Sequence, residues 1–265
     1  MRDSFCRLDG RRILLVGTGG IGTETAKELA AAGAKLLLVD HPVHGLKRGP
    51  SLQKELAEGG ADVSYFPSDI ESDSDVSRLL AEIEAAQLLP DSFVFTAGVV
   101  GLHGLNATVA QLAEQMNLHY YALHRFMQPL VPKWLEAGSG TAVVVTSVAA
   151  THPAIAKIGY SASKAAATNY IQSLAALYGP KGLRFVPMLL NRVGTESALE
   201  RAAISPAFEA EMVSTLLSGD WMKTAEVAGA IRYLLSPIAR SFNGSPFMLD
   251  DGANLALSPC PKAPV

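Results

Sequence analysis

The fold is decided by residues 13–22, which read Ile-Leu-Leu-Val-Gly-Thr-Gly-Gly-Ile-Gly. The four apolar residues predict a buried strand, and the residues after them predict a helix entered through a glycine-rich turn. A Gly-x-Gly-x-x-Gly loop between a strand and a helix is the setting that a dinucleotide site requires. Its glycines let the backbone approach a pyrophosphate, which then faces the N–H groups of the helix start. We therefore predict that Gly17, Gly19, Ile21 and Gly22 contact a dinucleotide; the alternative is a tight turn with no ligand.

The end of the next strand offers a second nucleotide contact. Asp40 lies eighteen positions after Gly22, where a carboxylate can accept hydrogen bonds from both hydroxyls of an adenosine ribose. The same charge repels a 2′-phosphate, and no arginine follows immediately to receive one. Asp40 therefore predicts NAD(H) rather than NADP(H) as the cofactor. The alternative is that Asp40 only begins a turn with His41 and Pro42.

Apolar runs alternate with amphipathic runs along the rest of the chain. Strands are expected at 13–16, 35–39, 62–66, 92–96, 142–146, 183–189 and 246–249, and helices at 23–32, 51–58, 74–86, 108–135, 160–177 and 225–235. The helical stretch 108–135 is expected to be interrupted by Pro129 and Pro132. Strands that are apolar on both faces belong in a parallel sheet covered by helices. We predict an α/β fold, a Rossmann-like doubly wound parallel sheet of about seven strands, with residues 1–265 as a single domain rather than two small ones.

Composition excludes several functions. The chain has 265 residues, a formal net charge of −3 and 22 Lys+Arg, which gives no basic surface for nucleic acid. No apolar stretch approaches the length of a membrane span. Cys6 and Cys260 lie near opposite ends, and no His, Cys, Asp or Glu group has metal-ligand spacing. We expect a cytoplasmic protein that binds no metal, nucleic acid or membrane.

The run Gly159-Tyr160-Ser161-Ala162-Ser163-Lys164 carries the chemistry. If the run is helical, the side chains of Tyr160 and Lys164 lie one turn apart on the same face. A nearby ammonium favours phenolate over phenol, so it would lower the pKa of Tyr160. Tyr160 is therefore a candidate to donate or accept the proton of an alcohol or carbonyl oxygen. Alone, the pair is also compatible with a surface tyrosine stacked on a lysine stem.

With the glycine-rich loop, Asp40 and Tyr160-x-x-x-Lys164 in this order, the chain resembles the short-chain dehydrogenase/reductase family over nearly its whole length. Further matches follow the same order: Asp69 and Ile70 beside the adenine, Ala97 and Gly98 after strand four, Asn117 in the fourth helix, Ser147 thirteen residues before Tyr160, Val193 and Thr195 at the nicotinamide, and Asn243-Gly244 through Asp250-Asp251-Gly252 near the end. The resemblance implies that these residues bind the cofactor or catalyse the reaction.

The chain also departs from the family pattern. Its glycine-rich loop is one residue shorter, and Phe95-Thr96 replaces two asparagines. Leu190-Asn191 stands where the family usually has Pro-Gly. Because proline cannot donate to a ladder, Pro187 within strand six predicts a bulge or an early strand end. These differences put the nicotinamide side of the site and the contact of Thr195 in question.

The resemblance implies an NAD(H)-dependent oxidoreductase that interconverts a secondary alcohol and a ketone on a small-molecule substrate. Lys164 would also hydrogen-bond the nicotinamide ribose, Ser147 would hold the reacting oxygen, and Asn117 would anchor a water that links Lys164 to solvent. Two simpler interpretations stay open. In the first, Asn117 only caps or kinks its helix. In the second, Ser147 only forms a hydrogen bond with a backbone group at the end of its strand.

The region 196–222 corresponds to the family's substrate lid. Its apolar residues predict an apolar substrate, with ordinary helix packing as the alternative; they are Leu199, Ile204, Phe208, Met212, Leu216, Leu217, Trp221 and Met222. His103, His119 and His152 are candidates to line the substrate pocket, although isolated histidines are more often polar edge residues. The resemblance further implies a homotetramer or homodimer built on residues 108–135 and 160–177, where Leu174 and Leu177 are apolar outer positions. The rival functions are a non-catalytic NAD(H) sensor or scaffold, and reduction of C=C or C=N bonds.

Overall fold

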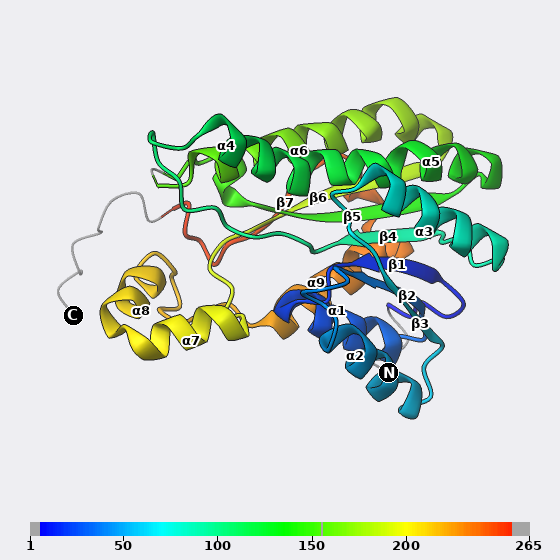
Figure 1. Ribbon diagram of the computed structural model, residues 1–265, viewed down its shortest axis with the longest axis horizontal. Helices are drawn as coiled ribbons and strands as arrows, with labels where there is room; N and C mark the ends of the chain where they lie inside the picture. Colours follow the sequence, from blue (N-terminus) through cyan, green and yellow to red (C-terminus); the bar gives the residue numbers. More distant parts are fainter. Residues whose placement is uncertain (1–5, 155, 256–265) are drawn as a thin grey trace.

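The computed structural model describes residues 6–154 and 156–255, and one parallel sheet runs through them (Figure 1). Its seven strands follow the order β3-β2-β1-β4-β5-β6-β7. Their bounds are β1 Arg12–Val16, β2 Lys35–Asp40, β3 Val63–Pro67, β4 Ser92–Phe95, β5 Gly140–Ser147, β6 Leu183–Leu190 and β7 Phe247–Leu249. The chain moves outward from β1 to β3 and then crosses to β4 on the other side of β1. The predicted doubly wound α/β fold is confirmed.

The strands are apolar on both faces because each face is covered by helices. Leu14 and Val16 of β1 pack into the core on one side of the sheet, and Ile13 and Leu15 pack into the core on the other. All four side chains are fully buried. The consecutive apolar residues of β1 therefore reflect burial of both faces of the sheet, because alternate residues pack into different hydrophobic cores.

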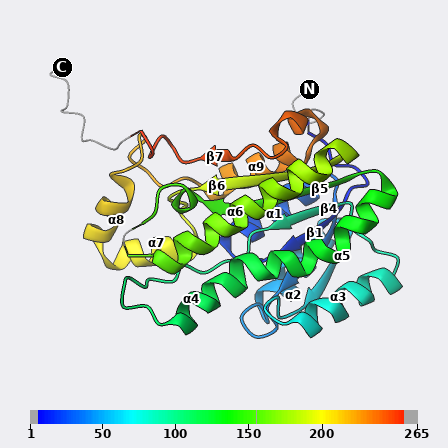
Figure 2. The same cartoon turned by 90° about the horizontal axis from the view of Figure 1, so that it is seen from above.

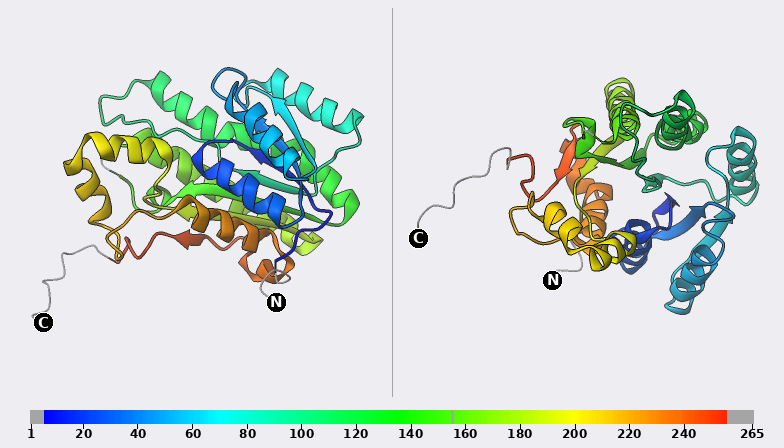
Figure 3. Two further views of the ribbon diagram at one scale, coloured as in Figure 1. Left: turned by 90° about the horizontal axis from the view of Figure 1, so that it is seen from below. Right: turned by 60° about the vertical axis from the view of Figure 1, so that its left-hand side comes forward.

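The helices form two layers (Figures 2 and 3). One face carries α3 (Asp73–Ala85), α4 (Val109–Met116), α5 (Ala122–Ala137) and α6 (Ile158–Tyr178), and the other carries α1 (Gly20–Ala31), α2 (Arg48–Glu58) and α9 (Thr224–Leu235). Two short helices, α7 (Glu196–Ile204) and α8 (Pro206–Val213), extend beyond the edge where β6 ends (Figure 1). They occupy most of the predicted lid region.

The long helical stretch is interrupted, but not at its prolines. A π-helix, η1 (Asn117–Tyr121), separates α4 from α5, and α5 continues through Pro129 and Pro132. The predicted interruption is therefore at the wrong place. Each proline costs a helix interior about 3 kcal/mol. That cost is offset by burial, because α5 packs seven residues into the core, and a large apolar side chain contributes about 1.5–3 kcal/mol when buried.

Strand β6 contains no bulge at Pro187, which corrects the second expectation about proline. The register with β5 is unbroken from Gly140 opposite Leu183 to Ser147 opposite Leu190. The N–H and the carbonyl of Phe185 both bond to the segment before β7, so the alternate residue Pro187 faces the same way. Pairing with β7 begins only at Met188. The missing N–H therefore removes no bond between β6 and β5.

The turn after β1 is packed so closely that glycine is required at two positions. Gly17 has a φ of +94°, and a Cβ there would lie 2.6 Å from the backbone nitrogen of Ala97. A Cβ on Gly22 would lie 1.9 Å from the carbonyl oxygen of Gly17. Gly19 differs, since a Cβ there would meet no atom within 4 Å. Gly17 and Gly22 are thus needed by the fold, whereas Gly19 borders open space.

This difference gives a matched test. Gly22→Ala should lower the free energy of unfolding by about 3 kcal/mol, because the added methyl overlaps a backbone oxygen that cannot move freely. Gly19→Ala, with a φ of −62° and free space, should keep the wild-type stability. Chemical denaturation of both variants measures the effect. Equal stability of the two would contradict the packing described here.

Candidate active site

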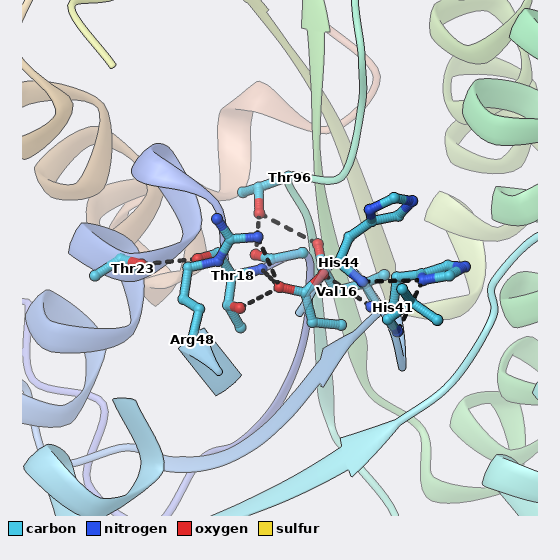
Figure 4. Close-up of polar contacts among 10 residues, drawn as sticks. Val16, Thr18, Thr23, His41, His44, Arg48 and Thr96 are labelled. Atoms are coloured by element: carbon cyan, nitrogen blue, oxygen red, sulfur yellow. Dashed lines mark hydrogen bonds and ion pairs between the residues drawn. The ribbon is translucent and has the colours of Figure 1, made fainter. Parts of the chain in front are cut away.

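The carboxyl ends of β1 and β4 lie side by side where the strand order reverses, which is where doubly wound sheets bind ligands. Thr96 joins the two ends. Its hydroxyl donates to the carbonyl of Gly17 at 2.7 Å, and its N–H donates to Val16 at 2.9 Å (Figure 4). Thr96 occupies one of the positions where the family has asparagine. It therefore anchors the shortened glycine-rich loop to β4.

The carboxylate of Asp40 is buried at the end of β2 and already has several partners. Oδ2 accepts hydrogen bonds from the N–H and the hydroxyl of Thr18, and Oδ1 accepts from the N–H of His41 at 2.8 Å. The guanidinium of Arg48 pairs with Oδ2 at 3.3 Å (Figure 4). Asp40 thus holds the glycine-rich loop and also begins the turn at His41. Neither Thr18 nor Arg48 was identified from the sequence as a partner of Asp40. Arg48 reaches the carboxylate because it begins helix α2, eight positions after Asp40.

The glycine-rich loop fits a dinucleotide. The first N–H groups of α1 have no partner within the helix, and the space beside Gly19 is open. The segment after β6 reaches the same loop, since a Cβ on Gly20 would lie 3.2 Å from Cβ of Thr195. Val193 is fixed nearby by a bridge to Met222. A pyrophosphate would be held at the helix start, between the loop and Thr195.

The catalytic candidates meet at the carboxyl end of β5. Ser147 ends the strand, and Tyr160 and Lys164 lie on α6 as predicted. Nζ of Lys164 lies 5.7 Å from the ring centre of Tyr160 and donates to the carbonyl of Val145 at 3.3 Å. Burial lowers the pKa of Lys164 to about 8. The sequence correctly placed this pair on one helical face.

The predicted effect of Lys164 on Tyr160 is wrong in this structure. Burial raises the pKa of the Tyr160 phenol, and a hydrogen bond with Ser147 acts in the opposite direction. Lys164 is not among the causes, because its ammonium lies over the ring and its hydrogen bond goes to Val145. Ser147 is therefore the side chain that favours the phenolate here.

Asn117 is not directed toward Lys164. It begins the π-helix, and its side-chain amide donates to the carbonyl oxygen of Glu71 at 3.3 Å and to its carboxylate at 3.2 Å. This geometry agrees with the alternative that Asn117 shapes its helix. A water held by Asn117 stays a prediction.

A buried histidine lies where the sequence offered only a weak candidate. His119 is 1% exposed, and its ring packs edge-on against Tyr160 at 5.4 Å between ring centres. Ser163 donates its hydroxyl proton to the carbonyl of Tyr160 and lies 2.9 Å from Nδ1 of His119. This network assigns the ring proton to Nδ1 and leaves Nε2 as a bare acceptor. Burial and the charge of Lys164 lower the pKa of His119 to about 2, so the ring is neutral.

The free nitrogen of His119 faces the same gap as Lys164. Nε2 is buried with no hydrogen-bond partner among the described residues. A Cβ on Gly98 would lie 3.0 Å from this atom and 3.3 Å from Nζ of Lys164. Gly98 therefore keeps open a small space between the two side chains. No signal in the sequence indicated that the π-helix would turn His119 inward.

A family model described as enoyl-(acyl carrier protein) reductase matches residues 16–254. The chain belongs to the short-chain dehydrogenase/reductase family. It is 30% identical over 256 residues to galactitol 2-dehydrogenase (L-tagatose-forming) of Cereibacter sphaeroides, covering 93% of this chain and 96% of the relative. It is 26% identical over 248 residues to 7alpha-hydroxysteroid dehydrogenase of Escherichia coli (strain K12), covering 93% and 95%. The chain is thus an oxidoreductase of this family.

Similar solved structures contain both kinds of nicotinamide cofactor. A 7 alpha-hydroxysteroid dehydrogenase in complex with NADH and 7-oxo glycochenodeoxycholic acid has a TM-score of 0.86 and 25% identity, covering 95% of this chain and 97% of that one. A 3-oxoacyl (acyl-carrier-protein) reductase from Agrobacterium tumefaciens C58 with NADP bound has the same TM-score, identity and coverage. The fold therefore accommodates either dinucleotide.

Other predicted residues of this short-chain dehydrogenase/reductase lie outside the cluster of Ser147, Tyr160 and Lys164. Ile70 is 7% exposed and packs into the core. His152 is exposed, and His103 uses its carbonyl to accept the N–H of Ile158. In the described part of the chain, no group of three or more His, Cys, Asp or Glu side chains could hold a metal ion. No helix within residues 6–154 and 156–255 has the length and apolar character needed to cross a bilayer.

The buried lysine gives a pH-dependent prediction. The pKa of Lys164 is about 8 in the folded protein and 10.5 when unperturbed, so between these values the unfolded chain binds more protons. The free energy of unfolding of the wild type, relative to Lys164→Met, should therefore rise by about 2 kcal/mol from pH 7 to pH 10. Denaturant titrations of both proteins at each pH measure the difference. A difference that is constant with pH, or that shrinks, would contradict it.

Proposed function

We propose that this chain is an NAD(H)-dependent oxidoreductase that interconverts a secondary alcohol and a ketone. The observation that carries the proposal is the meeting of Ser147, Tyr160 and Lys164 at the carboxyl end of β5, beside the glycine-rich loop. A phenol, a hydroxyl and a buried ammonium at one place suit proton transfer to a carbonyl oxygen. A scaffold that only bound NAD(H) would not need this set.

Each residue has a distinct part in the proposed reaction. The nicotinamide cofactor supplies or accepts the hydride when bound. Tyr160 gives its proton to the carbonyl oxygen during reduction and takes one from the alcohol during oxidation. Ser147 hydrogen-bonds the same oxygen as charge develops on it. Lys164 orients the nicotinamide ribose.

Replacement of the phenol tests this assignment. Tyr160→Phe should lower kcat by about 10²–10⁴-fold, the usual contribution of general acid–base catalysis, while NADH still binds. Turnover is followed by NADH absorbance, and binding by NADH fluorescence. Tyr178→Phe is the matched control, because it removes the same hydroxyl at the far end of α6, where the ring packs on Phe185. Wild-type turnover in Tyr160→Phe would reject Tyr160 as the acid and base.

The preference for NAD(H) rests on the charge of Asp40. Its carboxylate lies at the end of β2, where an adenosine ribose is bound in this fold, and it would repel a 2′-phosphate. Arg48 is the competing feature, since a guanidinium is a good phosphate ligand. Its pairing with Asp40 supports NAD(H), because the arginine is already engaged by a carboxylate.

Removal of the negative charge of Asp40 should release Arg48 from its ion pair, so that its guanidinium can bind a 2′-phosphate. Asp40→Asn keeps a hydrogen-bond acceptor for Thr18, and it should raise kcat/KM for NADPH about tenfold or more. The double variant Asp40→Asn/Arg48→Gln should lose that gain, because no cation is left for the 2′-phosphate. Steady-state rates with NADH and NADPH measure both effects. Equal use of the two cofactors by the wild type would contradict the proposed preference.

A second candidate is reduction of a C=C bond, as the description of the matching family model suggests. The serine argues for carbonyl chemistry, because its place beside Tyr160 suits a hydrogen bond to an oxygen. A panel of enones distinguishes the two reactions, since the products differ: an allylic alcohol from carbonyl reduction, a saturated ketone from C=C reduction.

We further infer a substrate with an apolar body. Leu199, Ile204 and Leu217 of the lid region are exposed, at 45%, 85% and 66%. Leu216, Trp221 and Met222 are buried instead, as ordinary helix packing predicts. Only part of the lid is therefore available to a ligand.

The homotetramer or homodimer and the cytoplasmic location are likewise proposals. On α6, Leu177 is 59% exposed and suits a subunit contact, whereas Leu174 packs against the core of its own chain. Cys6 is a free thiol, which suits a reducing compartment, and Cys260 lies outside the described residues.

A further inference from the structure

Two cations lie near the candidate residues Tyr160 and Ser147, one along the chain and one across the sheet. Lys157 precedes Tyr160 by three positions, at the start of α6. Arg192 lies two positions beyond Leu190, the residue that pairs with Ser147 across β5 and β6. Lys157 therefore precedes the helix that carries Tyr160, and Arg192 follows the strand that pairs with Ser147. Burial lowers the pKa of Lys157, and the charge of Arg192 lowers it further.

Neither cation has an ion-pair partner among the described residues. In the part of the chain that the structure describes, no hydrogen bond reaches the ammonium of Lys157 or the guanidinium of Arg192, and Nε of Arg192 is buried without a partner. Both side chains are partly buried, and burial lowers both pKa values. Two like charges withdrawn from water and left unpaired are unfavourable, unless a bound anion compensates them.

The lid adds a third cation and one acid. Arg201 of α7 stacks on Phe208 of α8 at 4.7 Å, and its charge also acts on Lys157. Glu211 of α8 acts on Lys157 and Arg192 in the opposite direction. Lys157 therefore lies within electrostatic reach of two further cations and one acid. An excess of positive charge of this kind favours the binding of an anionic group.

We propose that Lys157 and Arg192 bind an anionic group of the substrate, of the carboxylate class, while its ketone lies at Ser147 and Tyr160. This inference rests on the proposed carbonyl chemistry. It adds a negatively charged group at one end of the proposed apolar substrate. Arg192 suits a carboxylate, because its guanidinium can donate two parallel hydrogen bonds. Glu211 competes with the ligand for both cations.

The proposal is tested with levulinate and with longer keto acids that end in the same methyl ketone. Each acid is compared with its methyl ester, which lacks the negative charge. Their binding to the NADH-loaded enzyme is measured by the fluorescence of its tryptophans, of which Trp221 lies in the lid region, and their reduction by NADH absorbance. The acid should bind about tenfold or more tightly than its ester. Arg192→Gln should abolish this preference, Lys157→Gln should weaken it, and Glu211→Gln should strengthen it. Arg240→Gln removes an exposed cation elsewhere and should leave it unchanged.

The two readouts separate this inference from the proposed function. Equal binding of acids and esters, or a preference that survives Arg192→Gln, overturns the anionic site even if ketones are reduced. Preferential binding of acids without turnover supports the anionic site and counts against the carbonyl reaction. A change in NADH affinity in Arg192→Gln, with the acid preference retained, assigns Arg192 to the cofactor and overturns its role here.

Discussion

The structure depends on one close contact, between the chain that leaves β1 and the chain that leaves β4. Gly22 lies against the carbonyl of Gly17, and Gly17 lies against Ala97, with no room for a Cβ at either glycine. Thr96 closes the contact with a hydrogen bond to Gly17. Because both strands end here, the contact brings the start of α1 beside the residues after β4. The glycine-rich loop and the residues after β4 are therefore positioned by the same packing.

The proposed catalytic residues and the neighbouring His119 include groups whose ordinary charge states are disfavoured by burial. Lys164 has a lowered pKa, His119 is neutral, and the phenol of Tyr160 is harder to ionise than in water. Such shifts gather at functional sites, because chemistry needs groups poised between protonation states. Ser147 acts against the burial of Tyr160 by hydrogen bonding. The site therefore depends on a few directed bonds within an apolar surrounding.

The proposed cofactor and substrate ends of the site differ in how their charges are satisfied. At the proposed cofactor end, Asp40 has Thr18, His41 and Arg48 as partners, so its carboxylate also holds the loop. At the proposed substrate end, Lys157 and Arg192 have no such partners among the described residues. A charge satisfied within the chain serves the fold, whereas an unsatisfied one at a ligand site is available for recognition. Lys157 and Arg192 are therefore the charges that the proposed anionic site would use.

The sequence by itself determined the doubly wound fold, the glycine-rich loop and the pairing of Tyr160 with Lys164, because these follow from local periodicity and spacing. Tertiary structure decided the rest. Burial of apolar side chains kept α5 helical through Pro129 and Pro132. The backbone nitrogen of Pro187 faces away from β5, so the hydrogen bonds between β5 and β6 are complete. The π-helix turned His119 inward, Asn117 bonded to Glu71, and α2 returned Arg48 to Asp40. Each of these depends on how separate elements pack against one another, which local sequence patterns do not encode.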